Sequence, residues 1–84
     1  MEKIIISKIE KDFEAQKQQE VMALLSSITL EHVMGGTYNL HNTRMAILTL
    51  AKGNLQEVIT LTESAKTDFR DVIYWVWLDN KSTE

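Results

Sequence analysis

The chain contains no proline and only three glycines, which fall at two places, Gly35-Gly36 and Gly53. Glycine and proline are the residues that most often form the tight turns between strands. A chain with so few of them has few obvious strand-to-strand turns, and a sandwich or barrel of many short strands needs such turns at regular spacing. The sequence therefore favours an all-α fold.

The overall composition is that of a small globular protein. Apolar residues make up 44% of the chain and charged residues 25%, which rules out an intrinsically disordered protein. A chain of 84 residues has room for one hydrophobic core. We therefore predict a single helical domain over residues 1–80 and a frayed polar tail over residues 81–84. The absence of cysteine excludes a disulfide scaffold, a cysteine-ligated zinc site and thiol catalysis.

Charge and hydropathy bear on partners and location. The net charge of −3 argues against nucleic acid as the main partner. The apolar run near the N-terminus, Ile4–Ile6, and the longest run in the chain, Val72–Leu78, both fall far short of the ~20 residues that span a bilayer. Charged residues also follow the first run too soon for a signal peptide. We expect a cytoplasmic protein without membrane contact.

Apolar residues recur at steps of three and four over residues 1–28, which is typical of an amphipathic helix. They are Ile6, Ile9, Phe13, Val21, Leu24, Leu25 and Ile28. Residues 14–20 are almost entirely polar, so the pattern leaves open one long helix or two helices broken near Lys17. The segment could also begin as a short strand, because Ile4–Ile6 is β-branched.

The next feature is a segment rich in glycine and asparagine, Gly35–Asn42, which we predict to be the only real loop. Asn42 is then the candidate N-cap of a helix over residues 43–52. Apolar residues surround most of the circumference of this helix, and a helix of that kind is a buried one. We therefore place it at the centre of a compact fold of four or five helices.

Two capping signals predict two further helices. Asn54 and Glu57 form a capping-box pattern at the start of a helix over residues 55–66. The buried stripe expected for this helix is Leu55, Val58, Ile59, Thr62 and Ala65. Asp68 opens a last helix that runs to about Asn80. The competing prediction for residues 72–78 is a strand, because the segment has high β propensity. The capping signals and the lack of a second convincing strand favour the helix.

The last helix carries more apolar surface than one inner stripe needs. Its inner stripe is Phe69, Val72, Ile73 and Val76. At about 100° per residue, Tyr74 and Leu78 fall near the opposite side, while Trp75 and Trp77 fall on the flanks. Aromatic residues are enriched at the energetic centres of protein interfaces. We predict that these four residues form an interaction surface for a protein partner or a homodimer. The alternative is that the two tryptophans complete the core.

Catalytic and metal-binding patterns are weak throughout the chain. His32 and His41 lie nine residues apart, which matches no short zinc pattern, so we predict no metal and no cofactor. The carboxylates lie mostly at helix starts or on exposed faces, where the helix dipole accounts for them. No hydroxyl lies in a strand-turn-helix elbow, and so small a core can hardly enclose an active-site pocket. We predict no enzymatic activity.

The segment Gly35–Arg44 offers one alternative function, the binding of a small anion. Arg44 lies in the first turn of the predicted helix, where its charge would support an anion at the helix N-terminus. Tyr38 and His41 would line the same site. The segment lacks the lysine of a phosphate-binding loop.

A second alternative is a DNA-binding regulator, because residues 43–52 and 55–66 have the outline of a helix-turn-helix. The residues that the second helix offers to DNA are Gln56, Glu57, Thr60, Glu63 and Ser64. Its two glutamates would repel phosphate, so nucleic acid is the less favoured partner. The favoured function is a small non-enzymatic helical interaction or regulatory module that acts by surface contact.

Overall fold

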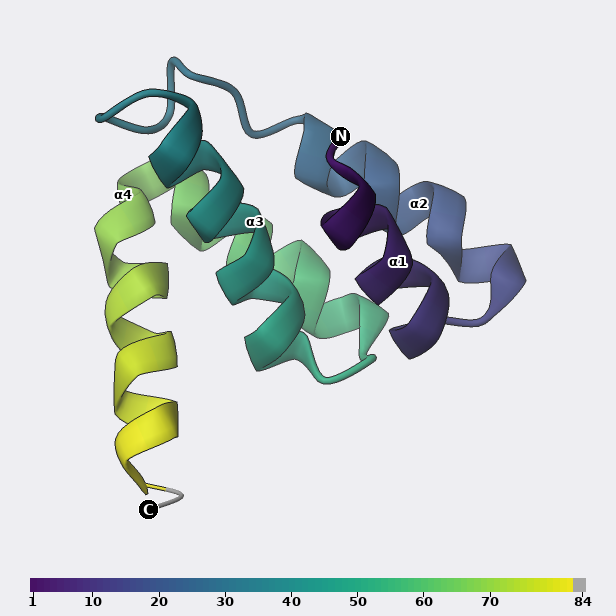
Figure 1. The fold of residues 1–84 in the computed structure, drawn as a ribbon. Helices are drawn as coiled ribbons and strands as arrows, with labels where there is room; N and C mark the ends of the chain where they lie inside the picture. The colour runs from purple at the N-terminus through teal and green to yellow at the C-terminus, as the bar shows by residue number, and fades with distance from the viewer. Residues whose placement is uncertain (83–84) are drawn as a thin grey trace.

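The computed structural model describes residues 1–82, which form four α-helices and no strand (Figure 1). The helices are α1 (Lys3–Asp12), α2 (Ala15–Ser26), α3 (Thr37–Ala51) and α4 (Leu55–Ser82). The predicted all-α class is confirmed, and so is the helical state of residues 72–78. The helix α4 extends two residues past the predicted end at about Asn80, to Ser82, and residues 83–84 of the predicted tail lie outside the described part.

The N-terminal segment forms two helices, and the break lies at Phe13 and Glu14 rather than near Lys17. Both residues have extended backbone angles, φ/ψ of −125°/144° for Phe13 and −61°/150° for Glu14. The Phe13 ring is buried, and the Gln18 side chain donates a hydrogen bond of 3.0 Å to the Phe13 carbonyl. The chain therefore turns where a large ring enters the core, and the polar run after it begins α2.

The predicted start of the third helix is wrong, because α3 begins at Thr37 instead of Thr43. Gly35 and Gly36 have φ of 90° and 76°, so they make the turn that leads into α3. Asn42 lies inside α3 and is not its N-cap. The loop occupies residues 27–36 instead. Asparagine and histidine are poor helix formers, and here tertiary packing overrides their intrinsic preference.

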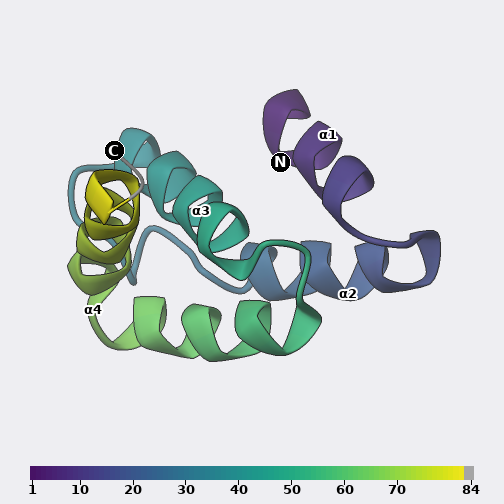
Figure 2. The ribbon, with the colours of Figure 1, turned by 90° about the horizontal axis from the view of Figure 1, so that it is seen from below.

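A bend divides α4 at Asp68, whose φ/ψ of −157°/101° is not helical. The Asp68 carboxylate accepts a hydrogen bond of 3.0 Å from the Arg70 backbone N–H, so it caps the residues that follow, as the sequence predicts. The first half of α4 (residues 55–67) and the second half (residues 69–82) point in clearly different directions (Figure 2). The bend turns the second half alongside α3.

One hydrophobic core joins the four helices of the described chain. Its buried members are Ile5, Ile9, Phe13, Val21, Leu25, Ile28, Val33, Ala46, Ile47, Leu48, Ala51, Val58, Leu61, Ala65, Phe69 and Val72. The radius of gyration, 11.9 Å, agrees with the roughly 12 Å expected of a compact chain of this length. No helix within residues 1–82 has both the length and the apolar character to cross a bilayer.

Within this core α3 lies between α1 and α2 on one side and the second half of α4 on the other (Figure 1). Its most extensive contact is with α4. One side of α3 is buried, including Ile47 and Leu48, but Met45, Thr49 and Leu50 are only half-buried. The expectation of a central helix buried on all sides is therefore not confirmed.

Candidate interaction surface

The second half of α4 has an inner and an outer side. Phe69 and Val72 are buried and Ile73 and Val76 half-buried, as the inner stripe predicts. The four residues of the predicted interaction surface are exposed: Tyr74 by 55%, Trp75 by 39%, Trp77 by 51% and Leu78 by 41%. The two tryptophans therefore do not complete the core.

Two of these aromatic rings pack against each other. The rings of Tyr74 and Trp77 stack with centroids 5.9 Å apart and planes 17° apart. The Lys81 ammonium lies over the Trp77 ring, 5.0 Å from its centroid, in a cation–π contact. The stack and the cation–π contact favour this arrangement of the two rings, so the pair presents a preformed aromatic surface.

The third ring, Trp75, faces a different side of the helix. It lines a shallow hollow of about 270 Å³ together with Glu63, Ser64, Thr67 and Asp71, inside the bend of α4. The structure therefore gathers Tyr74, Trp77 and Lys81 on one flank of the helix and places Trp75 on the other. Leu78 lies between the two flanks on the helix circumference.

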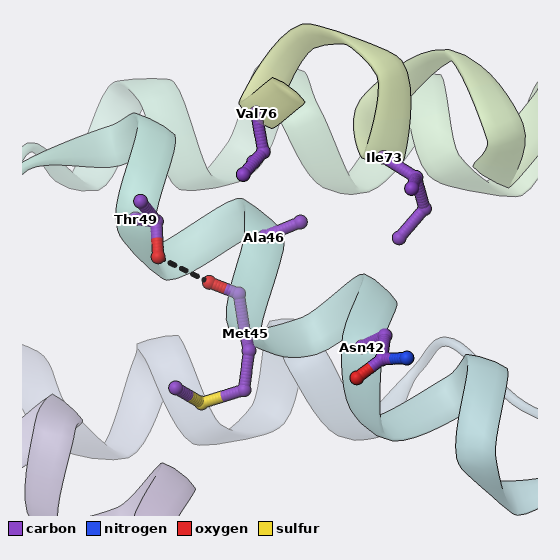
Figure 3. A pocket seen from close by; sticks show the side chains of 6 residues that line it. All are labelled: Asn42, Met45, Ala46, Thr49, Ile73 and Val76. Carbon is purple, nitrogen blue, oxygen red and sulfur yellow. Dashed lines mark hydrogen bonds between the residues drawn. The ribbon is translucent and has the colours of Figure 1, made fainter. Parts of the chain in front are cut away.

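An apolar groove of about 250 Å³ runs between α3 and the second half of α4. In Figure 3 Ile73 and Val76 point from α4 toward Ala46 of α3. The Thr49 hydroxyl donates a hydrogen bond of 2.9 Å to the Met45 carbonyl of its own helix, so it does not make this wall polar. Sequence reasoning missed the groove because its two walls meet only when α3 pairs with α4.

A second hollow, of about 370 Å³, adjoins the aromatic pair. It is lined by Asn39, Phe69, Arg70, Ile73, Tyr74 and Trp77. Arg70 does not bring a free charge to it, because its guanidinium binds both oxygens of Asp68 at 3.0 and 2.9 Å. This contact, mainly the side-chain hydrogen bond, lowers the pKa of Asp68 and raises that of Arg70.

The structure places two of the three residues of the predicted anion site against partners within the chain. Arg44 lies two turns into α3, where its guanidinium donates to the carbonyls of Leu25 at 3.0 Å and Ile28 at 2.8 Å. His41 Nδ1 lies 2.7 Å from a carboxylate oxygen of Glu2, and the Tyr38 side chain is 75% exposed. Burial lowers the pKa of Arg44, and the negative charge of Glu2 opposes that effect. Arg44 therefore satisfies carbonyls at the end of α2 and ties α2 to α3.

Groups that could hold a metal or read DNA are sparse in the described chain. No three side chains among the histidines, aspartates and glutamates of residues 1–82 lie close enough together to hold a metal ion. The exposed face of the first half of α4 includes Gln56, Glu57, Thr60 and Glu63, so two carboxylates lie where a recognition helix would need donors to phosphate and bases.

Comparison of the chain with models of protein families, with curated proteins and with solved structures finds no match. The basis for a functional proposal is therefore the exposed aromatic surface on α4.

Proposed function

We propose that this protein is a small non-enzymatic interaction module that acts through the outer side of the second half of α4. The observation that carries the proposal is the exposure of Tyr74, Trp77 and Leu78 on a regular helix whose inner side is already packed. Contiguous apolar surface of this kind on a small protein most often marks a contact site. Tyrosine and tryptophan also supply most of the binding energy at many interfaces.

The preformed stack of Tyr74 and Trp77 supports the same function. Fixing a long or aromatic side chain on binding costs roughly 0.5–1.5 kcal/mol in lost rotamer freedom. In this protein the stack and the Lys81 contact already hold the rings before any partner arrives. A partner therefore gains the apolar contact with a smaller entropic penalty.

In this proposal α3 is the central scaffold, because its buried side holds the second half of α4 in place. The partner is a protein rather than nucleic acid, since Glu57 and Glu63 on the exposed face of the first half of α4 repel phosphate. A cytoplasmic location is part of the same proposal.

A photocrosslinking experiment tests the proposal. Tyr74 is replaced by p-benzoylphenylalanine, which keeps an aromatic ring at the site, and the full chain is irradiated in extracts of its source cells. The matched control carries the same residue in place of Gln19, which is exposed on α2. We expect a discrete adduct from position 74 that excess wild-type protein suppresses. Equal labelling from positions 74 and 19 would contradict the proposal.

A further inference from the structure

The outer side of the second half of α4 has an order of residues that is complementary to itself. At about 100° per residue, four side chains lie within an arc of about 80°, opposite the buried Val72 and the half-buried Val76. In chain order they are Asp71, Tyr74, Leu78 and Lys81. Asp71 and Lys81 are both exposed, and Asp71, at one edge of the strip, also borders the hollow inside the bend that Glu63 and Trp75 line. The strip therefore runs from an acid through an aromatic and an aliphatic residue to a base.

A two-fold axis beside Val76 pairs this strip with a copy of itself in the antiparallel direction. Asp71 and Lys81 lie five residues before and after Val76, and Tyr74 and Leu78 lie two residues before and after it. Each Asp71 then lies opposite Lys81 of the second copy, and each Tyr74 opposite Leu78 of the second copy. A parallel pairing would instead place Asp71 against Asp71 and Lys81 against Lys81, which is unfavourable.

Two charged side chains beside the strip, Arg70 and Asp79, are already paired within the chain. Arg70 binds Asp68 through two hydrogen bonds, and Asp79 lies 3.8 Å from the Lys52 ammonium at the end of α3. Lys81 makes only a cation–π contact with Trp77 among the contacts that the structure describes for it, and that contact leaves its charge available to a carboxylate. At each end of the two paired strips, therefore, an acidic group of one copy faces a basic group of the other copy.

We propose that the occupant of this surface is a second copy of the chain, docked antiparallel along the second half of α4 by a two-fold axis. This inference rests on the proposed function, because it names the partner of the same surface. A single helix face covers less than the roughly 800 Å² per partner of a standard stable interface. The association is therefore reversible and depends on concentration.

Sedimentation of the full chain with a charge-swap set tests the proposal. Asp71→Lys and Lys81→Asp each place like charges at both symmetry-related contacts, and we expect each variant to self-associate roughly tenfold more weakly than the wild type. An equimolar mixture of the two variants is expected to recover the wild-type association, because every introduced charge then faces an opposite one. Circular dichroism checks that each variant is folded, and Leu78→Glu is expected to give a folded monomer.

A wild-type chain that stays monomeric at about 100 µM overturns the proposal, since a biological contact through this strip must form at such a concentration. A dimer that both single variants leave unchanged, or a mixture that does not recover, also overturns it. In either case a crosslinked adduct of another mass at position 74 would still support the proposed function. If no adduct forms at position 74 either, both the self-association and the proposed function are contradicted.

Discussion

Gly53 is a position where an added side chain would meet the backbone of another helix. Its φ is +81°, and a Cβ atom there would lie 2.8 Å from the Asp12 carbonyl oxygen at the end of α1. We expect Gly53→Ala to lower the free energy of unfolding by more than ~1 kcal/mol, because both the backbone and the neighbouring helix must move. Urea unfolding measures the loss.

Gly36→Ala is the matched control for this variant. Gly36 also has a positive φ, +76°, but nothing lies within 4 Å of the Cβ position. Its loss therefore reports backbone strain without a steric contact. A loss below ~1 kcal/mol from Gly53→Ala would contradict the explanation from the contact with Asp12.

Thr62 and Thr43 are both fully buried, but their hydroxyls differ in hydrogen bonding. The Thr43 hydroxyl donates a hydrogen bond of 2.7 Å to the Asn39 carbonyl, whereas the Thr62 hydroxyl has no hydrogen-bond partner within residues 1–82. A buried hydroxyl without a partner costs roughly 1–3 kcal/mol, and valine has nearly the same shape. We expect Thr62→Val to raise the free energy of unfolding by about 1 kcal/mol. Thr43→Val is expected to give no gain, and a gain from both variants of equal size would refute this explanation.

The connection between α2 and α3 depends on Arg44. Replacing it by methionine keeps the apolar stem and removes the guanidinium that donates to the carbonyls of Leu25 and Ile28. The Leu25 carbonyl keeps the Ile28 backbone N–H as a donor, whereas the Ile28 carbonyl loses its side-chain donor. We expect Arg44→Met to lower the free energy of unfolding by about 1.5–3 kcal/mol, the range for hydrogen bonds to a charged group. Arg44→Lys restores the charge but not the two-pronged geometry, so it recovers only part of the loss in thermal unfolding.

The same variants test whether Arg44 also binds anions. Because its guanidinium is already engaged with α2, phosphate is expected to raise the melting temperature of the wild type no more than chloride at equal ionic strength. A specific phosphate effect that Arg44→Met abolishes would contradict this expectation.

The second half of α4 begins with a cap that depends on pH. Hydrogen bonds from the Arg70 side chain and backbone lower the pKa of Asp68 below its ordinary value of 3.8. A group with a depressed pKa stabilises the fold above its unfolded pKa and loses that contribution as pH falls through the folded pKa. We therefore expect Asp68→Asn to flatten the acid limb of a stability–pH curve below about pH 4.

Asp68→Ala is the comparison that separates the cap from the ion pair. Asparagine retains an acceptor for the Arg70 backbone N–H, so Asp68→Asn should lose less stability at neutral pH than Asp68→Ala. Equal stability of the two variants at neutral pH would show that the cap is unimportant.

These elements also show which parts of the fold can be predicted from sequence. The caps at Asn54 and Asp68 act within three residues, so the local sequence pattern was sufficient to predict them. The Asn54 side chain accepts a hydrogen bond of 3.0 Å from the Glu57 backbone N–H, as predicted. The start of α3 was not predictable in this way. Arg44 of that helix binds carbonyls 16 and 19 residues earlier, and such long-range contacts leave no local signal.

The candidate surface likewise has one part that the sequence predicts and another that depends on long-range contacts. The exposure of Tyr74 and Leu78 follows from the helical period, which places them opposite Val72 and Val76. The groove beside Ile73 could not be predicted, because it needs the bend at Asp68 and the pairing of α4 with α3. The stack of Tyr74 on Trp77 joins residues three apart, a spacing at which side chains on a helix are neighbours.

Leu48 tests whether the whole molecule depends on one core. It is fully buried on α3, which contacts both α1 and α4, so Leu48→Ala opens a cavity where these helices meet. We expect a loss of about 2–5 kcal/mol, whereas Leu50→Ala, at a half-buried position of the same helix, should cost less. Chemical denaturation measures both losses.

The two tryptophans make the same experiment a test of cooperativity. Trp75 and Trp77 both lie in the second half of α4, so fluorescence reports that half, while circular dichroism reports all the helices. Because Phe69 and Val72 share the core with Leu48, we expect the two transitions to coincide in the wild type and to shift together in Leu48→Ala. A fluorescence transition that comes first, and that Leu48→Ala leaves in place, would show that the second half of α4 detaches from α3 as an independent unit. The exposed aromatic surface would then not be held in one position by the core.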